Sequence, residues 1–120
     1  MRVRLIVLGL GVAGLLAGGV VFGLGHTLYE EMIYEDGQPL NPNLIDYRVP
    51  AFEHLPKEFH SYLLENRNGP GPFGSKGMGE GGILPVASAI ANAVAQATGV
   101  RFYDLPLTPP RVWKALQSKK

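Results

Sequence analysis

The feature that most constrains the fold is the apolar N-terminal run, which contains no charged residue from Leu5 to Gly25. A run of this length can cross a bilayer, and the two arginines before it are typical of a signal peptide or of a cytoplasm-anchored helix. Its glycines, for example Gly14 and Gly18, allow helices to pack closely. They also weaken a helix, by about 1 kcal/mol each relative to alanine. One alternative is therefore that residues 1–25 anchor or export the chain.

The same segment imitates a dinucleotide-binding fingerprint. Val3 to Leu8 has the composition of a buried strand, and the six residues from Gly9 to Gly14 carry glycine at the spacing that brings a pyrophosphate to a helix N-terminus. However, the glycines from Gly18 onward would break the helix that must follow, and too little chain remains for a doubly wound sheet. A nucleotide-binding module is thus a third alternative, behind the two described below.

Length and composition limit what the chain does alone. At 120 residues it forms one small domain, and its 16 glycines and 10 prolines place much of it in turns and loops. The net charge is +1, with both signs spread along the sequence, so nucleic acid is not an expected partner. The absence of cysteine excludes disulfides and Cys-ligated zinc or iron–sulfur clusters within this chain.

Apolar residues recur at helical spacing in the first third of the chain. From Gly18 they predict an amphipathic helix that continues to Met32 and an acidic cluster. His26 and Glu30 lie one turn apart, but without a third ligand the pair is expected to form a hydrogen bond and not a metal site. Asp36 and Gly37 are typical of a turn, which we expect to lead into an extended loop over residues 38–50.

Local signals in the remaining chain predict two more helices. Ile83 to Thr98 has an apolar helical face, and Gly99 is a common helix stop. Thr108 can cap a final helix with Pro109 at its first position. Short segments whose apolar pattern fits an extended chain are expected as strands: Phe59–Leu64 and Arg101–Leu105.

A glycine-rich loop precedes the second of these helices. In Gly77-Met78-Gly79-Glu80-Gly81-Gly82, glycine surrounds a single carboxylate. Because glycine lacks a Cβ, the backbone can turn sharply and a large ligand can approach it. Long structured loops are often functional, and the following helix N-terminus favours an anion. We therefore expect Glu80 to be a buried acid or base at the edge of a site.

Four ordered blocks of sequence resemble one known family. They are Gly23-Leu24-Gly25 with Leu28-Tyr29-Glu30-Glu31, Leu40-Asn41-Pro42-Asn43-Leu44 with Asp46-Tyr47-Arg48-Val49-Pro50, Gly71 to Gly82, and Leu105-Pro106-Leu107-Thr108-Pro109 with Arg111-Val112-Trp113. Over residues 18–118 the chain is similar to the C-terminal part of the molybdopterin-binding large subunit of the xanthine dehydrogenase and aldehyde oxidase family, the molybdenum hydroxylases. The resemblance implies an α+β fragment of that domain, with about three helices, short strands and long Gly/Pro-rich loops.

The resemblance also implies a function. In the family, the glutamate of this loop is the general base that takes a proton from a hydroxide on molybdenum, and the substrate is an aldehyde or N-heterocycle that becomes hydroxylated. Glu80 occupies that position, and the cofactor-binding residues are expected to be Gly77, Gly79, Ser75 and Lys76, the last two chiefly as loop architecture. The implied cofactor is molybdenum–molybdopterin, with iron–sulfur clusters and FAD on other domains or subunits. No metal ligand is expected within this chain.

The chain also departs from the family. Leu15 stands where a glutamine that lines the cofactor pocket is usual, and residues 1–17 form an apolar segment that departs from the family pattern. Near the other end of the chain, Pro110 replaces a glutamate. The family's subunit is several times longer, so the expected partner is the remainder of that subunit in the cytoplasm, and we expect the chain alone to lack most of the cofactor site. The alternative is a noncatalytic, membrane-associated or secreted small protein that retains the family's tail.

Overall fold

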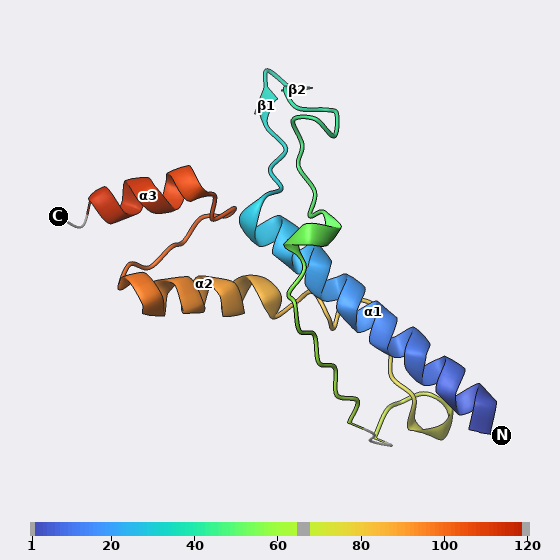
Figure 1. Ribbon diagram of the computed structural model, residues 1–120. Coiled ribbons are helices and arrows are strands. Elements are labelled where there is room, and N and C mark those ends of the chain that lie inside the picture. Colours follow the sequence, from blue (N-terminus) through green and yellow to red (C-terminus); the bar gives the residue numbers. More distant parts are fainter. Residues whose placement is uncertain (1, 65–67, 119–120) are drawn as a thin grey trace.

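The computed structural model describes residues 2–64 and 68–118, with side chains from residue 13 onward. The described chain contains three α-helices, one two-stranded hairpin and two short 3-10 helices (Figure 1). This is the α+β architecture expected from the sequence. Its elements are α1 (Arg2–Leu28), β1 (Tyr34–Glu35), β2 (Gln38–Pro39), η1 (Phe52–His54), η2 (Pro72–Gly74), α2 (Val86–Thr98) and α3 (Pro109–Gln117).

Helix α1 is one continuous helix of 27 residues, despite its glycines. It includes residues 3–8, so the strand that a dinucleotide fingerprint requires is not formed and that alternative is wrong. The helix also runs without a break past residue 17. Among the described residues, no helix combines the length and apolarity needed to span a bilayer. The anchor or signal considered for residues 1–25 stays a prediction, because the side chains of this segment are described only from residue 13.

Helix α1 ends earlier than the apolar spacing predicts. It stops at Leu28, and the amides of Tyr29 and Glu30 both donate to the carbonyl of Gly25 at 2.9 Å. Met32, predicted to be helical, lies in a segment without regular secondary structure. The reason is a contact distant in sequence: the buried side chain of Asn41 holds the segment that leaves the helix.

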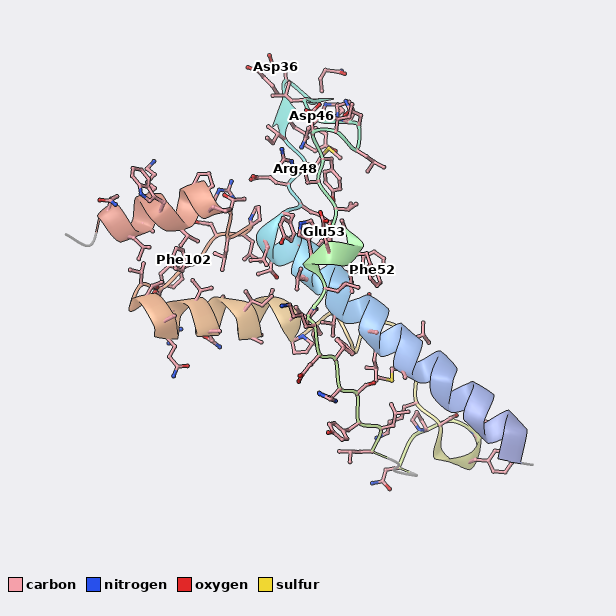
Figure 2. The ribbon with its side chains drawn as sticks, viewed as in Figure 1. Asp36, Asp46, Arg48, Phe52, Glu53 and Phe102 are labelled. Carbon is pink, nitrogen blue, oxygen red and sulfur yellow. The ribbon has the colours of Figure 1, made fainter. Side chains whose placement is uncertain are left out.

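Residues 31–50 form a projecting arm. The side chain of Asn41 accepts from Ile33 N at 2.9 Å and donates to Glu31 O at 2.6 Å. At its tip β1 and β2 pair antiparallel around the predicted turn, where Asp36 and Gly37 have φ of 47° and 77°. The turn is therefore confirmed, but the loop expected from residue 38 begins with a strand. Figure 2 shows that the labelled Asp36 and Asp46 lie at the end of the arm that is far from the helices.

Helices α2 and α3 match the local signals closely. Helix α2 begins at Val86, three residues later than predicted, and ends at Thr98. Gly99 follows it with a φ of 68°, and its amide donates a hydrogen bond to Ala95 O at 2.8 Å, which confirms the predicted stop. Helix α3 begins at Pro109 as predicted, although Thr108 makes no side-chain capping bond. The strands predicted at residues 59–64 and 101–105 are wrong. Both segments are irregular and pair with no described strand.

The buried core is small and lies where α1 ends. Thr27 is fully buried, and its hydroxyl donates to Gly23 O at 2.5 Å. Its carbonyl accepts from the amide of Leu107 at 2.6 Å, which ties the segment before α3 to α1. Leu107 and Val86 are the buried apolar side chains among the described residues. The radius of gyration is 18.4 Å, whereas a compact domain of this length has about 14 Å. Much apolar surface is thus left uncovered.

Candidate functional site between helix α1 and the glycine loop

A groove of about 560 Å³ is lined on one side by α1 and on the other by the glycine loop. The loop side of the groove carries Gly79 and Glu80, followed by Ile83. The helix side consists of small or apolar residues: Gly14, Leu15, Gly18, Gly19 and Phe22. The groove therefore joins the predicted catalytic residue to a helix far away in the sequence.

Glycines bring the two sides of the groove together. A Cβ on Gly19 would lie 2.9 Å from Gly82 Cα, and one on Gly82 would lie 3.0 Å from Leu16 O. One turn further along α1, a Cβ on Gly23 would overlap the side chain of Val86. Real Cβ atoms do not tolerate such contacts, so these glycines allow the loop and the start of α2 to lie directly on α1.

Glu80 is exposed in this chain, so the expectation of a buried carboxylate is wrong for the described structure. Its carbonyl accepts from the amides of Ile83 and Leu84 at 3.1 and 3.2 Å, which fixes the backbone in a turn before α2. Its side chain makes no hydrogen bond or ion pair with any residue that the structure describes. Glu80 is also the sole titratable residue of the groove lining. The fixed backbone and unpaired carboxylate leave Glu80 able to accept a hydrogen bond from a ligand.

The residues predicted to bind cofactor lie on two sides of the loop. Gly79 lines the groove with Glu80, whereas Ser75, Lys76 and Gly77 line a second hollow of about 510 Å³. Leu64, Met78, Gly74 and Gly81 complete that hollow. The structure thus brings Gly79 and Glu80 together, and separately Ser75, Lys76 and Gly77, with the loop backbone between the two hollows.

Ser75 holds the shape of the loop. Its carbonyl accepts from Gly71 N at 3.2 Å, its amide donates to Pro72 O at 3.2 Å, and Gly74 O accepts from Gly69 N at 3.1 Å. These bonds close the turn around η2. All of them are backbone bonds, so the expectation that the serine serves chiefly in the architecture of the loop stays a prediction.

The backbone at Gly77 and Gly79 fits a large hydrogen-bonding cofactor. A Cβ on either residue would meet no atom within 4 Å, and neither has a positive φ. Within the described part of the chain, neither amide makes a backbone hydrogen bond. No described contact requires glycine at the two positions, so the open space and the N–H groups suit a group that comes from outside this chain.

Sequence reasoning missed the helix side of the groove. It read Gly14 and Gly18 as a packing motif and Leu15 as a departure from a family pattern, without placing either beside Glu80. The sequence did contain one indication of this contact: Gly14 and Gly18 lie four residues apart, which predicts that another segment can pack closely against one face of the helix. It does not identify the segment that makes the approach.

A second cluster of titratable side chains lies at the end of α1, away from the groove. Tyr47 donates its hydroxyl to Glu30 Oε2 at 2.8 Å, and His26 Nε2 lies 3.7 Å from the same oxygen. The hydrogen bond to Glu30, burial and the carboxylate charge raise the pKa of Tyr47. No group of three or more metal-ligating side chains occurs among the residues that the structure describes. His26 and Glu30 thus lie in contact, but at 3.7 Å the predicted hydrogen bond between them is not formed, and Tyr47 makes the hydrogen bond to Glu30 instead.

The described fold and loop are similar to those of molybdopterin-binding oxidoreductases. A family model for a molybdopterin cofactor-binding domain matches residues 9–56. The chain is 44% identical over 103 residues to the xanthine dehydrogenase molybdenum-binding subunit of Escherichia coli O157:H7, which covers 84% of this chain and 14% of the relative. It is 40% identical over 108 residues to the gamma subunit of the 6-hydroxypseudooxynicotine dehydrogenase complex of Paenarthrobacter nicotinovorans, covering 87% of this chain and 14% of that subunit.

A solved structure shows the same fold. The crystal structure of quinoline 2-oxidoreductase from Pseudomonas putida 86 aligns with a TM-score of 0.74 and 33% identity, over 87% of this chain and 14% of that chain. The chain belongs to the xanthine dehydrogenase and aldehyde oxidase family of molybdenum-cofactor oxidoreductases, and it corresponds to part of their molybdopterin-binding subunit. The predicted family is confirmed. The chain spans about one seventh of the length of the relatives it matches.

Proposed function

We propose that this chain supplies the glycine loop and the general base Glu80 to a molybdenum hydroxylase. The reaction would hydroxylate an electron-poor carbon of an aldehyde or an N-heterocycle with oxygen derived from water. The observation that carries the proposal is the position of Glu80, which is the single titratable group in a groove whose opposite wall is an apolar helix.

The proposed role of Glu80 follows from its surroundings. A general base must come within hydrogen-bond distance of the proton that it removes. The exposed carboxylate has no competing partner among the described residues, and glycine on both sides leaves room for a ligand beside the backbone. An oxygen of Glu80 would thus accept the proton of the water-derived hydroxyl group as that oxygen forms its bond to the substrate carbon.

The loop would hold the cofactor through its backbone. Gly77 and Gly79 would donate their free amides to it, while Ser75 keeps the loop in shape and Lys76 adds a positive charge beside the second hollow. When bound, the molybdenum cofactor supplies the oxygen transfer and the two-electron redox chemistry. The apolar side chains of α1 in the groove would limit the access of water to Glu80.

The rest of the site would come from a larger assembly. The chain spans 14% of its relatives and leaves much apolar surface exposed, so we propose the remainder of a molybdopterin-binding subunit as its partner, in the cytoplasm. Iron–sulfur clusters and FAD would be carried by other domains or subunits. On this basis we expect the chain alone to be inactive.

The test is Glu80→Gln in the complete molybdenum-containing complex. Loss of a general base lowers turnover by about 10²- to 10⁴-fold, and the molybdenum content should stay unchanged because the amide keeps the size of the side chain. Glu53→Gln is a matched control, since Glu53 is an exposed carboxylate in η1 outside the groove (Figure 2). Turnover of Glu80→Gln equal to that of the control would reject the base assignment.

A further inference from the structure

We propose that residues 101–104 pair their backbone with an extended, acidic segment from outside this chain, which fills the hollow between these residues and α3. The hollow has a volume of about 680 Å³ and shares no lining residue with the groove beside Glu80. The inference rests on the proposed function only in placing that segment in the remainder of the molybdopterin-binding subunit.

The backbone of residues 101–104 is anchored at both ends and unpaired between them. Before the segment, Val100 N donates to Thr98 Oγ1 at 3.2 Å. After it, Leu107 N donates to Thr27 O at 2.6 Å. No amide or carbonyl of residues 101–104 makes a hydrogen bond with any residue that the structure describes. A strand from a partner would satisfy these groups through main-chain hydrogen bonds.

The side chains of the segment suit such pairing. Phe102 and Tyr103 are aromatic residues, which are enriched in strands. Phe102, labelled in Figure 2, lies on the connection between α2 and α3. Tyr103 is 87% exposed, so nothing in the described chain covers it. An added strand would cover both rings while it pairs with the backbone that carries them.

The charge of the lining indicates which segment fits. Three cations and two carboxylates border the hollow: Arg101, Arg111, Lys114, Glu31 and Asp104. Arg111 and Glu31 already pair with each other, so two cations and one carboxylate remain. The ammonium group of Lys114 makes no hydrogen bond or ion pair with any described residue. Acidic side chains on the incoming segment would pair with Lys114 and Arg101, whereas basic ones would be repelled.

The rest of the lining also bears on the occupant. Leu105, Leu107 and Ala115 give the hollow apolar surface, and successive side chains of a strand point to opposite faces. Alternate residues of the segment should therefore be apolar. The chain covers 14% of a relative, so most of such a subunit lies outside it. A second copy of this chain fits less well, because it would bring the same excess of positive charge against itself.

The experiment is an NMR titration of the ¹⁵N-labelled full chain with the acetylated and amidated peptide Glu-Val-Thr-Val-Glu. We expect saturable shifts of the amides of residues 101–104, with slower hydrogen exchange at saturation. The peptide Lys-Val-Thr-Val-Lys should bind about fivefold more weakly, because its charges meet cations. The acidic peptide with N-methyl groups on both valines and on threonine keeps its charge but loses three backbone donors, and should bind about tenfold more weakly.

A chain variant tests the charge from the other side. Lys114→Glu should weaken binding of the acidic peptide by about fivefold. Lys57→Glu is the matched control, since Lys57 is exposed and lies outside the lining of the hollow. It should bind the acidic peptide as the unsubstituted chain does.

Several results would overturn the inference. Absence of saturable shifts at residues 101–104 would remove the site, and undiminished binding of the N-methylated peptide would remove the backbone pairing. Equal affinity for the two charged peptides, or equal affinity of the two lysine variants, would remove the acidic specificity. Shifts of the same amides when the chain is concentrated without peptide would make a second copy the occupant. Because the titration needs neither cofactor nor turnover, its failure is separate from failure of Glu80 as a base.

Discussion

Gly19 of α1 lies directly against Gly82 of the glycine loop, so close that a Cβ on Gly19 would come within 2.9 Å of Gly82 Cα. The neighbouring Gly18 faces open space, where a Cβ would meet nothing within 4 Å. Two adjacent glycines in one helix thus have opposite surroundings. Packing requires a glycine at Gly19, whereas no described contact requires one at Gly18.

We predict that Gly19→Ala destabilises the chain by about 1–3 kcal/mol, because the added methyl group forces backbone away from backbone. Gly18→Ala is the matched variant and should be neutral or stabilising by up to about 1 kcal/mol, since alanine is the better helix former. Urea denaturation followed by circular dichroism measures both. Equal effects of the two substitutions would mean that the loop does not lie on α1 at Gly19.

The elements that the sequence predicted correctly depend on local chemistry. Gly99 ends α2 because it adopts a positive φ at little cost, and Pro109 begins α3 because its fixed φ suits a first helical position. The turn at Asp36 and Gly37 is of the same kind. Each of these signals acts within a few residues and needs no knowledge of the rest of the chain.

The predictions that failed concern longer-range structure. Residues 59–64 and 101–105 have a pattern that a strand can use, but a strand also needs a partner, and no described segment pairs with them. Helix α1 ends at Leu28 instead of continuing through Met32, because Asn41 binds the backbone that follows. Tertiary contacts decided both outcomes.

The candidate site was predicted in part. The glycine loop identified Glu80, but the helix that faces it could not be found from spacing alone, since the contact joins residues more than sixty positions apart. The expected burial of Glu80 also failed. In this chain one helix and one loop border the groove, so the carboxylate remains exposed.

The buried amide of Asn41 gives a second prediction. Asn41→Ala would leave the Glu31 carbonyl and the Ile33 amide without their partner, at a cost of about 1–3 kcal/mol to the arm. Hydrogen exchange at Leu40, whose amide donates to Ile33 O at 2.8 Å, should become faster. Asn43→Ala is the control, because its side-chain bonds are exposed and a smaller effect is expected. Equal exchange in both variants would contradict a locking role for Asn41.

The bond between Tyr47 and Glu30 gives a pH-dependent prediction. The hydrogen bond to Glu30 raises the pKa of Tyr47 above the ordinary value of 10.0, with burial and the carboxylate charge acting in the same direction. Its stabilising contribution is therefore fully present below pH 10.0 and is lost as the pH rises through the folded-state value. The difference in unfolding free energy between the unsubstituted chain and Tyr47→Phe should be constant at neutral pH and shrink at alkaline pH.

Urea denaturation at a series of pH values measures that difference. Tyr62→Phe is the control, because Tyr62 is 84% exposed and no hydrogen bond of its hydroxyl is described. The control should show no such change relative to the unsubstituted chain. A Tyr47→Phe difference that stays constant into the alkaline range would show that the bond to Glu30 does not control the titration of Tyr47.

Arg111 of α3 makes two kinds of contact that differ in their expected energy, one with the segment that follows α1 and one with the segment that precedes α3. Its Nη2 donates to Glu31 Oε1 at 2.5 Å, and its Nη1 donates to the carbonyls of Leu105 and Pro106 at 2.8 and 3.2 Å. The ion pair is partly exposed on both sides, so Glu31→Gln should cost less than about 1 kcal/mol. Arg111→Ala also removes the carbonyl contacts and should cost about 1–3 kcal/mol.

Salt separates the two contributions. Added salt screens an exposed ion pair far more than a hydrogen bond to a carbonyl. The loss of unfolding free energy caused by Glu31→Gln should therefore vanish in molar sodium chloride, while most of the loss caused by Arg111→Ala persists. Urea denaturation at low and high salt measures both variants. If the effect of Arg111→Ala also vanished in salt, the carbonyl contacts would contribute little, and the stabilisation by Arg111 would come from the ion pair.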